Sequence, residues 1–205
     1  MTNQLEATGG AENRDRAEPH LTAMHRTAEQ LEAGIDAIRA SPRTEGTIDW
    51  IACRPSPGER IVLETATLDV AGGLVGDNWV TRPTKSPDQK PHPDAQVTLM
   101  NVRSVELVAG VRDRWALAGD QLYVDLDLSL ENLPAGTRLQ VGSAVLEVTA
   151  LPHTGCAKFT ERFGSAASRW VNTPVGRSLN LRGINARVVA AGDVRVGDVV
   201  RKLAD

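Results

Sequence analysis

The sharpest chemical signal in the sequence is a short run around one cysteine. The run is Leu151-Pro152-His153-Thr154-Gly155-Cys156-Ala157-Lys158-Phe159. It leaves a predicted strand and places His153 and Lys158 close to Cys156 in sequence. A thiol acts as a nucleophile or metal ligand only as thiolate, and neighbouring cations or a helix start lower its pKa toward that state. We therefore take Cys156 and His153 as candidate catalytic residues. The alternative is a partly buried cysteine in a strand-to-helix turn.

Other catalytic and metal-binding patterns are weaker. His153 and Cys156 form only half of a zinc site, because no second pair completes it. The sequence has no Gly-x-Ser-x-Gly elbow, phosphate-binding loop or dinucleotide fingerprint. It also has no flavin, haem or iron–sulfur fingerprint, so any redox cycle must draw electrons from a donor protein. Cys53, at the end of a predicted strand, is interpreted as a small apolar residue.

Composition describes an ordinary globular protein. The 205 residues include 23 Lys+Arg against 26 Asp+Glu, a formal charge of −3 that argues against a nucleic-acid partner. No apolar run approaches the roughly 20 residues needed to cross a bilayer. The first thirty residues lack the apolar centre of a signal peptide. We therefore expect a cytoplasmic protein without membrane contact, whose two distant cysteines act as separate thiols.

The N-terminal part divides into a leader and a helix. Residues 1–18 are polar and are predicted to be a disordered leader. Residues 19–42 are predicted to be an amphipathic helix with Pro19 in its first turn and Pro42 as its stop. Its apolar stripe consists of Leu21, Met24, Ala28, Leu31, Ile35 and Ile38. The stripe either packs on its own domain or forms the seam of a homodimer.

Short strands dominate the rest of the chain, residues 47–202. The predicted strands are Thr47–Cys53, Arg60–Val70, Ala95–Met100, Gln121–Ser129, Arg138–Val141, Ala144–Leu151, Asn185–Ala190 and Val194–Arg201. Helical segments are predicted at Val102–Ala109 and 157–172, and a proline-rich loop at 82–94. Many short strands without an alternating βαβ rhythm favour a mainly β, α+β fold built on a closed or partly closed barrel.

Three ordered blocks in the second half of the chain form one pattern. The first holds Leu130-Glu131-Asn132-Leu133 followed by Gly136-Thr137-Arg138-Leu139-Gln140-Val141-Gly142. The second is Ala144–Phe159, which leads from a predicted strand to Cys156. The third is the closing run Leu181-Arg182-Gly183-Ile184-Asn185-Ala186-Arg187-Val188 with Gly192, Gly197 and Asp198. These blocks resemble the MOSC domain, the C-terminal module of molybdenum cofactor sulfurases, which also occurs as stand-alone bacterial proteins, and the cysteine of the family falls on Cys156. Upstream, Gly73-Leu74-Val75-Gly76-Asp77 is similar to the family's Gly-Asp turn.

The resemblance implies a β-barrel with flanking helices, comparable to the barrel domain of pyruvate kinase. It implies molybdenum cofactor (molybdopterin) as the ligand, with Cys156 as molybdenum ligand or as sulfur carrier. A soft thiolate suits a soft metal centre, and it can also hold a persulfide sulfur. No aminotransferase-like region accompanies these blocks, so pyridoxal phosphate is not expected in this chain.

The anionic end of such a cofactor needs basic groups. The resemblance makes Lys158, Arg182, Arg187 and, more distantly, Arg60 candidates for that role, and adds Asn132 as a cofactor contact. Arg182 could instead brace the barrel end through backbone carbonyls. Three functions remain open: reduction of N-hydroxylated or related small substrates, sulfur transfer through a persulfide on Cys156, and non-catalytic storage or delivery of the cofactor.

Overall fold

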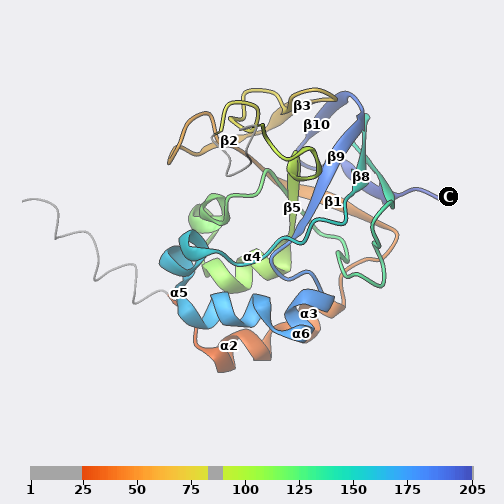
Figure 1. Ribbon diagram of the computed structural model, residues 1–205. Helices are drawn as coiled ribbons and strands as arrows, with labels where there is room; N and C mark the ends of the chain where they lie inside the picture. Colours follow the sequence, from red (N-terminus) through yellow and green to blue (C-terminus); the bar gives the residue numbers. More distant parts are fainter. Residues whose placement is uncertain (1–24, 83–89, 205) are drawn as a thin grey trace, which may run out of the picture.

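A computed structural model describes residues 25–82 and 90–204 of the protein (Figure 1). Within these residues, seven strands close into a barrel in the order β1-β11-β7-β8-β9-β5-β6, and β6 pairs again with β1. Their bounds are β1 (Glu45–Cys53), β5 (Val97–Asn101), β6 (Leu122–Val124), β7 (Arg138–Val141), β8 (Ala144–Val148), β9 (Ile184–Ala190) and β11 (Val199–Lys202). The structure thus confirms the mainly β, α+β barrel that the sequence predicts.

Smaller strands extend this barrel. β2 (Ile61–Leu63) pairs with the end of β1, and a separate sheet orders β10 (Gly192–Arg195), β3 (Thr65–Asp69) and β4 (Gly73–Leu74). Among the barrel pairs described, only β5 and β6 run parallel. Their connection carries α4 (Val102–Ala109) and the 3-10 helix η2 (Arg112–Ala118), as expected for parallel neighbours, which need a crossover.

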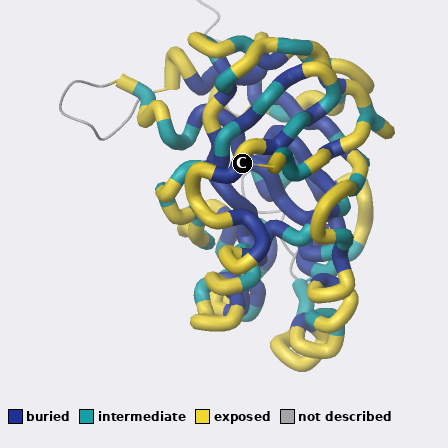
Figure 2. The backbone as a smooth tube through the Cα atoms, turned by 90° about the vertical axis from the view of Figure 1, so that its right-hand side faces the viewer, coloured by how far each residue is buried: buried dark blue, intermediate teal, exposed yellow. Residues whose placement is uncertain are grey.

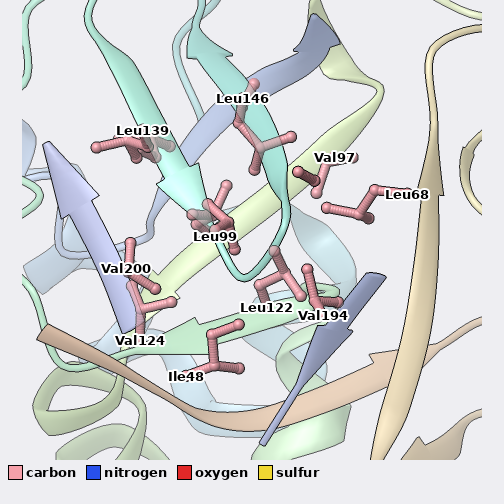
Figure 3. Packing of buried hydrophobic residues seen from close by; sticks show 14 of the residues in the cluster. Ile48, Leu68, Val97, Leu99, Leu122, Val124, Leu139, Leu146, Val194 and Val200 are labelled. Carbon is pink, nitrogen blue, oxygen red and sulfur yellow. The ribbon is translucent and has the colours of Figure 1, made fainter. Parts of the chain in front are cut away.

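Side chains at alternate positions along the strands fill the barrel interior. In β7, Leu139 and Val141 are buried, whereas Arg138 and Gln140 are not. Successive strand side chains point to opposite faces, so one face of each strand supplies the core. Figure 3 shows buried side chains of this core from the barrel strands, Ile48, Val97, Leu99, Leu122, Val124, Leu139, Leu146 and Val200, together with Leu68 of β3 and Val194 of β10 from the smaller sheet.

The helices gather at one end of the barrel, around a second core (Figure 1). They are α2 (Ala28–Ala33), α3 (Ile35–Arg39), α4, α5 (Ala157–Asn172) and α6 (Pro174–Ser178), with a short 3-10 turn, η1 (Pro93–Ala95), near β5. Leu31, Met100 and Phe163 are fully buried between these helices and the barrel. Figure 2 shows the exposed residues on the outward turns of this helical end. None of the helices within the described ranges is long and apolar enough to cross a membrane.

The predicted helix over 19–42 requires a correction. Residues 1–24, including the predicted leader, lie outside the described residues. The remainder forms two short helices, α2 and α3, that meet at Gly34. A Cβ at Gly34 would lie 2.5 Å from Cδ2 of Leu107, so the chain turns where α4 approaches it. Helix α2 begins at Thr27, which forms a capping box with Gln30.

Several predicted strands are shorter or divided. The prediction over Ala144–Leu151 becomes β8, which ends at Val148. The prediction over Arg60–Val70 becomes β2 and β3, separated at Glu64. The prediction over Val194–Arg201 becomes β10 and β11, because Gly197 adopts a φ of 91° in the turn between them. Of the prediction over Gln121–Ser129, only β6 is a strand. Hydrophobic alternation continues through such turns, so it does not reveal where the strand ladder ends. Much of the proline-rich loop, 83–89, lies outside the described residues.

Candidate functional site

Cys156 is exposed at the start of helix α5. It is the N-cap residue, yet its side chain makes no capping hydrogen bond, so the thiol is not used in holding the helix. The turn before it is clamped by Asn172. The amide of Asn172 accepts from the Gly155 N–H at 3.3 Å and donates to the Gly155 carbonyl at 3.2 Å. The sequence prediction of a helix beginning after Cys156 is confirmed.

A kink in α5 makes this clamp possible. Gly164 has a φ of 86°, which breaks the helix into two halves. Residues eight apart in a straight helix would lie about 12 Å apart along its axis. Here the hydroxyl of Thr160 donates to that of Ser168 at 2.8 Å, so the second half folds back beside the first. Asn172, at the far end of α5, thereby reaches the turn at its beginning.

His153 lies beside a buried carboxylate. Its Nδ1 is 3.4 Å from Oδ1 of Asp120, whose side chain is fully buried, without a well-aligned hydrogen bond between the two atoms. Burial, followed by the charge of nearby Arg182, lowers the pKa of His153 to about 3, although Asp120 opposes the shift. His153 is therefore a neutral imidazole at physiological pH. A Cβ at Gly183 would lie 3.4 Å from Nδ1 of His153 and 2.2 Å from the Leu99 carbonyl oxygen, so only glycine allows this approach.

Arg182 is the buried partner of Asp120. Its Nη1 lies 2.6 Å from Oδ2 of Asp120, and its Nη2 donates to the Ala118 carbonyl at 2.7 Å. The guanidinium also lies over the ring of Phe159, with 4.9 Å between its central carbon and the ring centroid. Phe159 is in the first turn of α5. The chain of contacts from His153 through Asp120 and Arg182 thus ends one helical turn from Cys156.

Three arginines from different elements bind successive carbonyls at the end of η2. Arg162 donates to Leu117, Arg182 to Ala118 and Arg54 to Gly119, at 2.7–2.9 Å. The carbonyl end of a helix carries partial negative charge, which guanidinium groups offset. This arrangement joins the end of β1, the middle of α5 and the start of β9 around residues 117–120.

Arg54 also accounts for how the Gly-Asp turn is held in place. Asp77 is fully buried and accepts from Nε and Nη2 of Arg54 at 2.8 and 2.9 Å, as well as from the Arg54 backbone N–H at 3.0 Å. This bidentate pair fixes the turn against the end of β1. Asp77 thus acts as an anchor for an arginine that reaches the η2 carbonyls.

Arg60 completes a group of closely spaced cations. Its Nη1 donates to the neighbouring Glu59 carbonyl, while its Nε is buried without a hydrogen-bond partner among the described residues. Burial, then the charges of Arg162 and Arg54, lowers the pKa of Arg60. A Cβ at Gly119 would lie 3.9 Å from Arg60 and 4.0 Å from Arg162, so both guanidiniums approach the same point. We call Arg54, Arg60 and Arg162 the arginine cluster.

The other predicted contacts lie apart from these interactions. Lys158 is exposed in the first turn of α5. Arg187 is exposed on β9 and pairs with Glu147 on the neighbouring strand β8, at 2.5 Å. The side chain of Asn132 is buried and donates to the carbonyls of Arg43 and Asp127, so it braces a loop. The structure therefore connects His153 and Arg182 through Asp120, and Phe159 under Arg182 lies one helical turn from Cys156. Arg60 lies with Arg162 beside Gly119.

Several residues of the site carry no signal in the sequence. Asp120 and Arg54 are far from Cys156 along the chain, Arg162 and Asn172 lie further along the helix that follows it, and none stands in a motif of known spacing. Only the fold brings them together. In the described part of the chain, no group of three or more His, Cys, Asp or Glu side chains could hold a metal ion.

Comparisons with known proteins agree with this fold. The sequence profile of the MOSC domain matches residues 86–201. The YuaD protein from Bacillus subtilis superimposes with a TM-score of 0.57 at 17% identity, over 78% of this chain and 96% of that one. YiiM from Geobacillus stearothermophilus superimposes with a TM-score of 0.54 at 14% identity, over 78% and 75%. None of the curated proteins matches the chain in sequence.

Proposed function

The chain belongs to the MOSC domain family, and from that membership we propose that it binds molybdenum cofactor, with Cys156 as the thiolate ligand of molybdenum. The observation that carries this proposal is the position of the thiol. Cys156 is exposed at the start of α5 and free of capping contacts, one turn from Phe159 and the buried Arg182–Asp120 pair. The cofactor brings its metal with its own sulfur ligands, so one protein thiolate is enough to anchor it.

The arginine cluster fits the anionic end of the cofactor better than the arginines of the closing block. Arg182 is bound to Asp120 and Arg187 to Glu147, whereas Arg60 has no carboxylate partner among the described residues and its Nε is buried without an acceptor there. Cations held this close together stabilise a bound anion, and guanidinium groups suit phosphate geometry. In this proposal Arg60 and Arg162 therefore hold the phosphate. Arg182 supports the site through its contacts with Asp120 and the Ala118 carbonyl.

When bound, the cofactor supplies a two-electron redox centre. The residues of this chain bind and orient it: Cys156 contacts the metal, the Asn172 clamp fixes the turn that presents the thiol, and neutral His153 lines the adjacent wall. The corresponding activity is reduction of N-hydroxylated or related small substrates, with electrons from a donor protein.

Sulfur transfer is the second candidate. Cys156 is exposed, whereas Cys53, the other cysteine of the chain, is buried with 2% of its surface accessible. A persulfide on Cys156 would thus be open to an acceptor and would have no exposed cysteine in its own chain to form a disulfide with.

Elemental and pterin analysis separates these functions. The protein is expressed in a host that makes the cofactor and compared with Cys156→Ser, Cys53→Ser and Arg60→Ala. The proposal predicts stoichiometric molybdenum and pterin in the wild type and in Cys53→Ser, and a large loss in the other two variants. Molybdenum without reductase activity indicates storage or delivery. Intact mass showing one added sulfur on Cys156, with no molybdenum or pterin, overturns the proposal in favour of sulfur transfer.

A further inference from the structure

A cavity of about 370 Å³ opens beside His153. Its walls come from the loop at 130–135, the end of β8 with the segment that follows it, and the α6–β9 region. Leu133, Val148 and Ile184 form its buried side, and Leu130, which is 55% exposed, stands at its rim. A cavity of this size and lining is typical of small-molecule sites. An exposed leucine at the rim favours an occupant with apolar surface.

His153 has an unused hydrogen-bonding atom on this wall. Its Nδ1 faces the carboxylate of Asp120, so a neutral ring with its proton on Nδ1 leaves Nε2 as an acceptor. No described residue bonds to Nε2. By contrast, the amide groups of Asn180 and Asn185 already donate to the carbonyls of Leu128 and Leu151. Nε2 of His153 is thus an acceptor without a donor among the described residues, on a cavity wall that is mostly apolar.

The charges around the cavity favour an uncharged occupant. His153 is neutral, and the charge of Asp120 is offset by Arg182 at 2.6 Å. Arg177 also lines the cavity, but it is exposed and its Nε donates to the Asn172 carbonyl. A solvated guanidinium contributes little to holding an anion.

From these observations we propose that the cavity binds a small uncharged molecule, apolar over most of its surface, that donates one hydrogen bond to Nε2 of His153. Thr154 lines the same cavity, two residues before Cys156. The occupant is therefore the substrate of the Cys156 site, an assignment that rests on the proposed function. The binding property itself does not require the cofactor.

Three probes of similar shape test this chemistry on the full chain purified without cofactor. Phenol is uncharged and donates a hydrogen bond, anisole has the same ring without the donor, and benzoate is an anion. Affinities are measured by ligand-observed NMR titration. We expect phenol to bind about 2- to 10-fold more tightly than anisole, the range for one neutral hydrogen bond, and benzoate to bind more weakly than both. Anisole equal to phenol, or benzoate tighter than phenol, overturns the proposal.

Two variants locate the binding. Ala150→Trp places a large side chain at an exposed position of the cavity wall, and Ala71→Trp is the matched control in an exposed turn outside it. We expect at least a 10-fold loss of phenol affinity in the first and no change in the second. His153→Phe should keep anisole binding and abolish the preference for phenol. Unchanged phenol affinity in Ala150→Trp, with an unchanged melting temperature, overturns the proposal.

The proposed function and the cavity assignment can be disproved independently of each other. Cys156→Ser should lose molybdenum while phenol affinity stays the same. If the wild type lacks molybdenum but binds phenol in this cavity, the proposed function fails and the cavity assignment stands. If it holds molybdenum but phenol does not bind, the cavity assignment fails alone.

Discussion

At the scale of single residues, burial separates the two cysteines. Cys53 is 2% exposed at the end of β1, and burial, then the charge of Asp77, raises the pKa of its thiol. Cys156 is exposed at the start of a helix. Alkylation requires both access and thiolate, so iodoacetamide should modify Cys156 at least ten times faster than Cys53. Peptide mapping of the native protein over a pH series measures both rates. Faster labelling of Cys53 would reverse the assignment.

His153 gives the protein a measurable pH dependence. Its pKa in the folded state, about 3, lies below the ordinary 6.5. As pH falls below 6.5, the unfolded chain takes up a proton that the native state does not, so stability decreases by up to about 1.4 kcal/mol per pH unit. This stability is fully present above pH 6.5 and is lost progressively down to pH 3. Urea unfolding between pH 7.5 and 5 should therefore show a decrease in wild type that is about 1–2 kcal/mol smaller in His153→Gln. Parallel profiles would contradict the shift.

Arg182 and Arg60 should respond differently to removal. Arg182→Ala leaves the buried Asp120 carboxylate without its cation, a change that costs about 3–5 kcal/mol for such pairs. Arg60→Ala removes a cation that crowds Arg162 and Arg54, so stability should hold or rise. Thermal unfolding compares the two variants, and cofactor content reports anion binding. If Arg182→Ala stayed as stable as the wild type and lost only cofactor, Arg182 would be assigned to phosphate binding, as the sequence suggested.

The sequence could predict only part of this site. Cys156 and His153 are three residues apart, so local reasoning finds both. Asp120 is found only after folding, because its partners His153 and Arg182 lie 33 and 62 residues away. Gly183 is likewise explained only by the fold, because the side where a Cβ would stand faces the Leu99 carbonyl and the His153 ring. Glycine marks a close approach without revealing what approaches.

At the scale of elements, predictions succeeded where the hydrophobic period and the end signals coincide. Helix α4 and strand β7 have the predicted bounds, and α5 matches the predicted 157–172. Strand β9, which carries most of the closing run, pairs with β8, the strand that leads toward Cys156. Predictions failed where tertiary contacts decide. The split at Gly34 depends on Leu107, 73 residues away, and the kink at Gly164 occurs within an amphipathic pattern that continues past it.

At the scale of elements, the Asn172 clamp also holds the turn that presents Cys156. Asn172→Ala removes both hydrogen bonds to the Gly155 backbone, while the kink at Gly164 stays. We expect a loss of about 1–3 kcal/mol, in line with two neutral hydrogen bonds, together with faster hydrogen exchange at Gly155 and Cys156. Exchange measured by mass spectrometry checks the prediction. Arg169→Ala, at an exposed position of the same helix half, is the control and should leave exchange at the turn unchanged.

At the scale of the whole molecule, the barrel and the helical layer have separate cores that meet along β5 and β6. Side chains of these strands alternate between them: Leu99 and Leu122 belong to the barrel core, whereas Met100 and Tyr123 belong to the helical core. The site lies where the segments after β8 and before β9 pass from one layer to the other. Residues 117–120 and the arginines bound to them connect the same two layers.

The N-terminal helices α2 and α3 form part of the helical layer. Leu31 is fully buried with Phe163 and other residues of the helical core, and Glu32 accepts a hydrogen bond from Trp170 at 3.3 Å. Leu31 and Ile38 of the apolar stripe are thus covered by their own chain, whereas Ala28 is exposed. Leu31→Ala should cost about 2–5 kcal/mol, as for other buried leucines.

If the stripe instead joined two subunits, unfolding would depend on protein concentration, because dimer dissociation contributes to the transition. Melting temperatures of wild type and Leu31→Ala are therefore compared over a hundredfold range of concentration, with mass measured by light scattering. We expect the variant to melt at lower temperature by the same amount at every concentration, without a change in mass. A decrease that grows on dilution, with loss of a dimer, would assign Leu31 to the seam. Glu29→Ala, at an exposed position on the same helix, should behave as wild type apart from a small loss at the helix start.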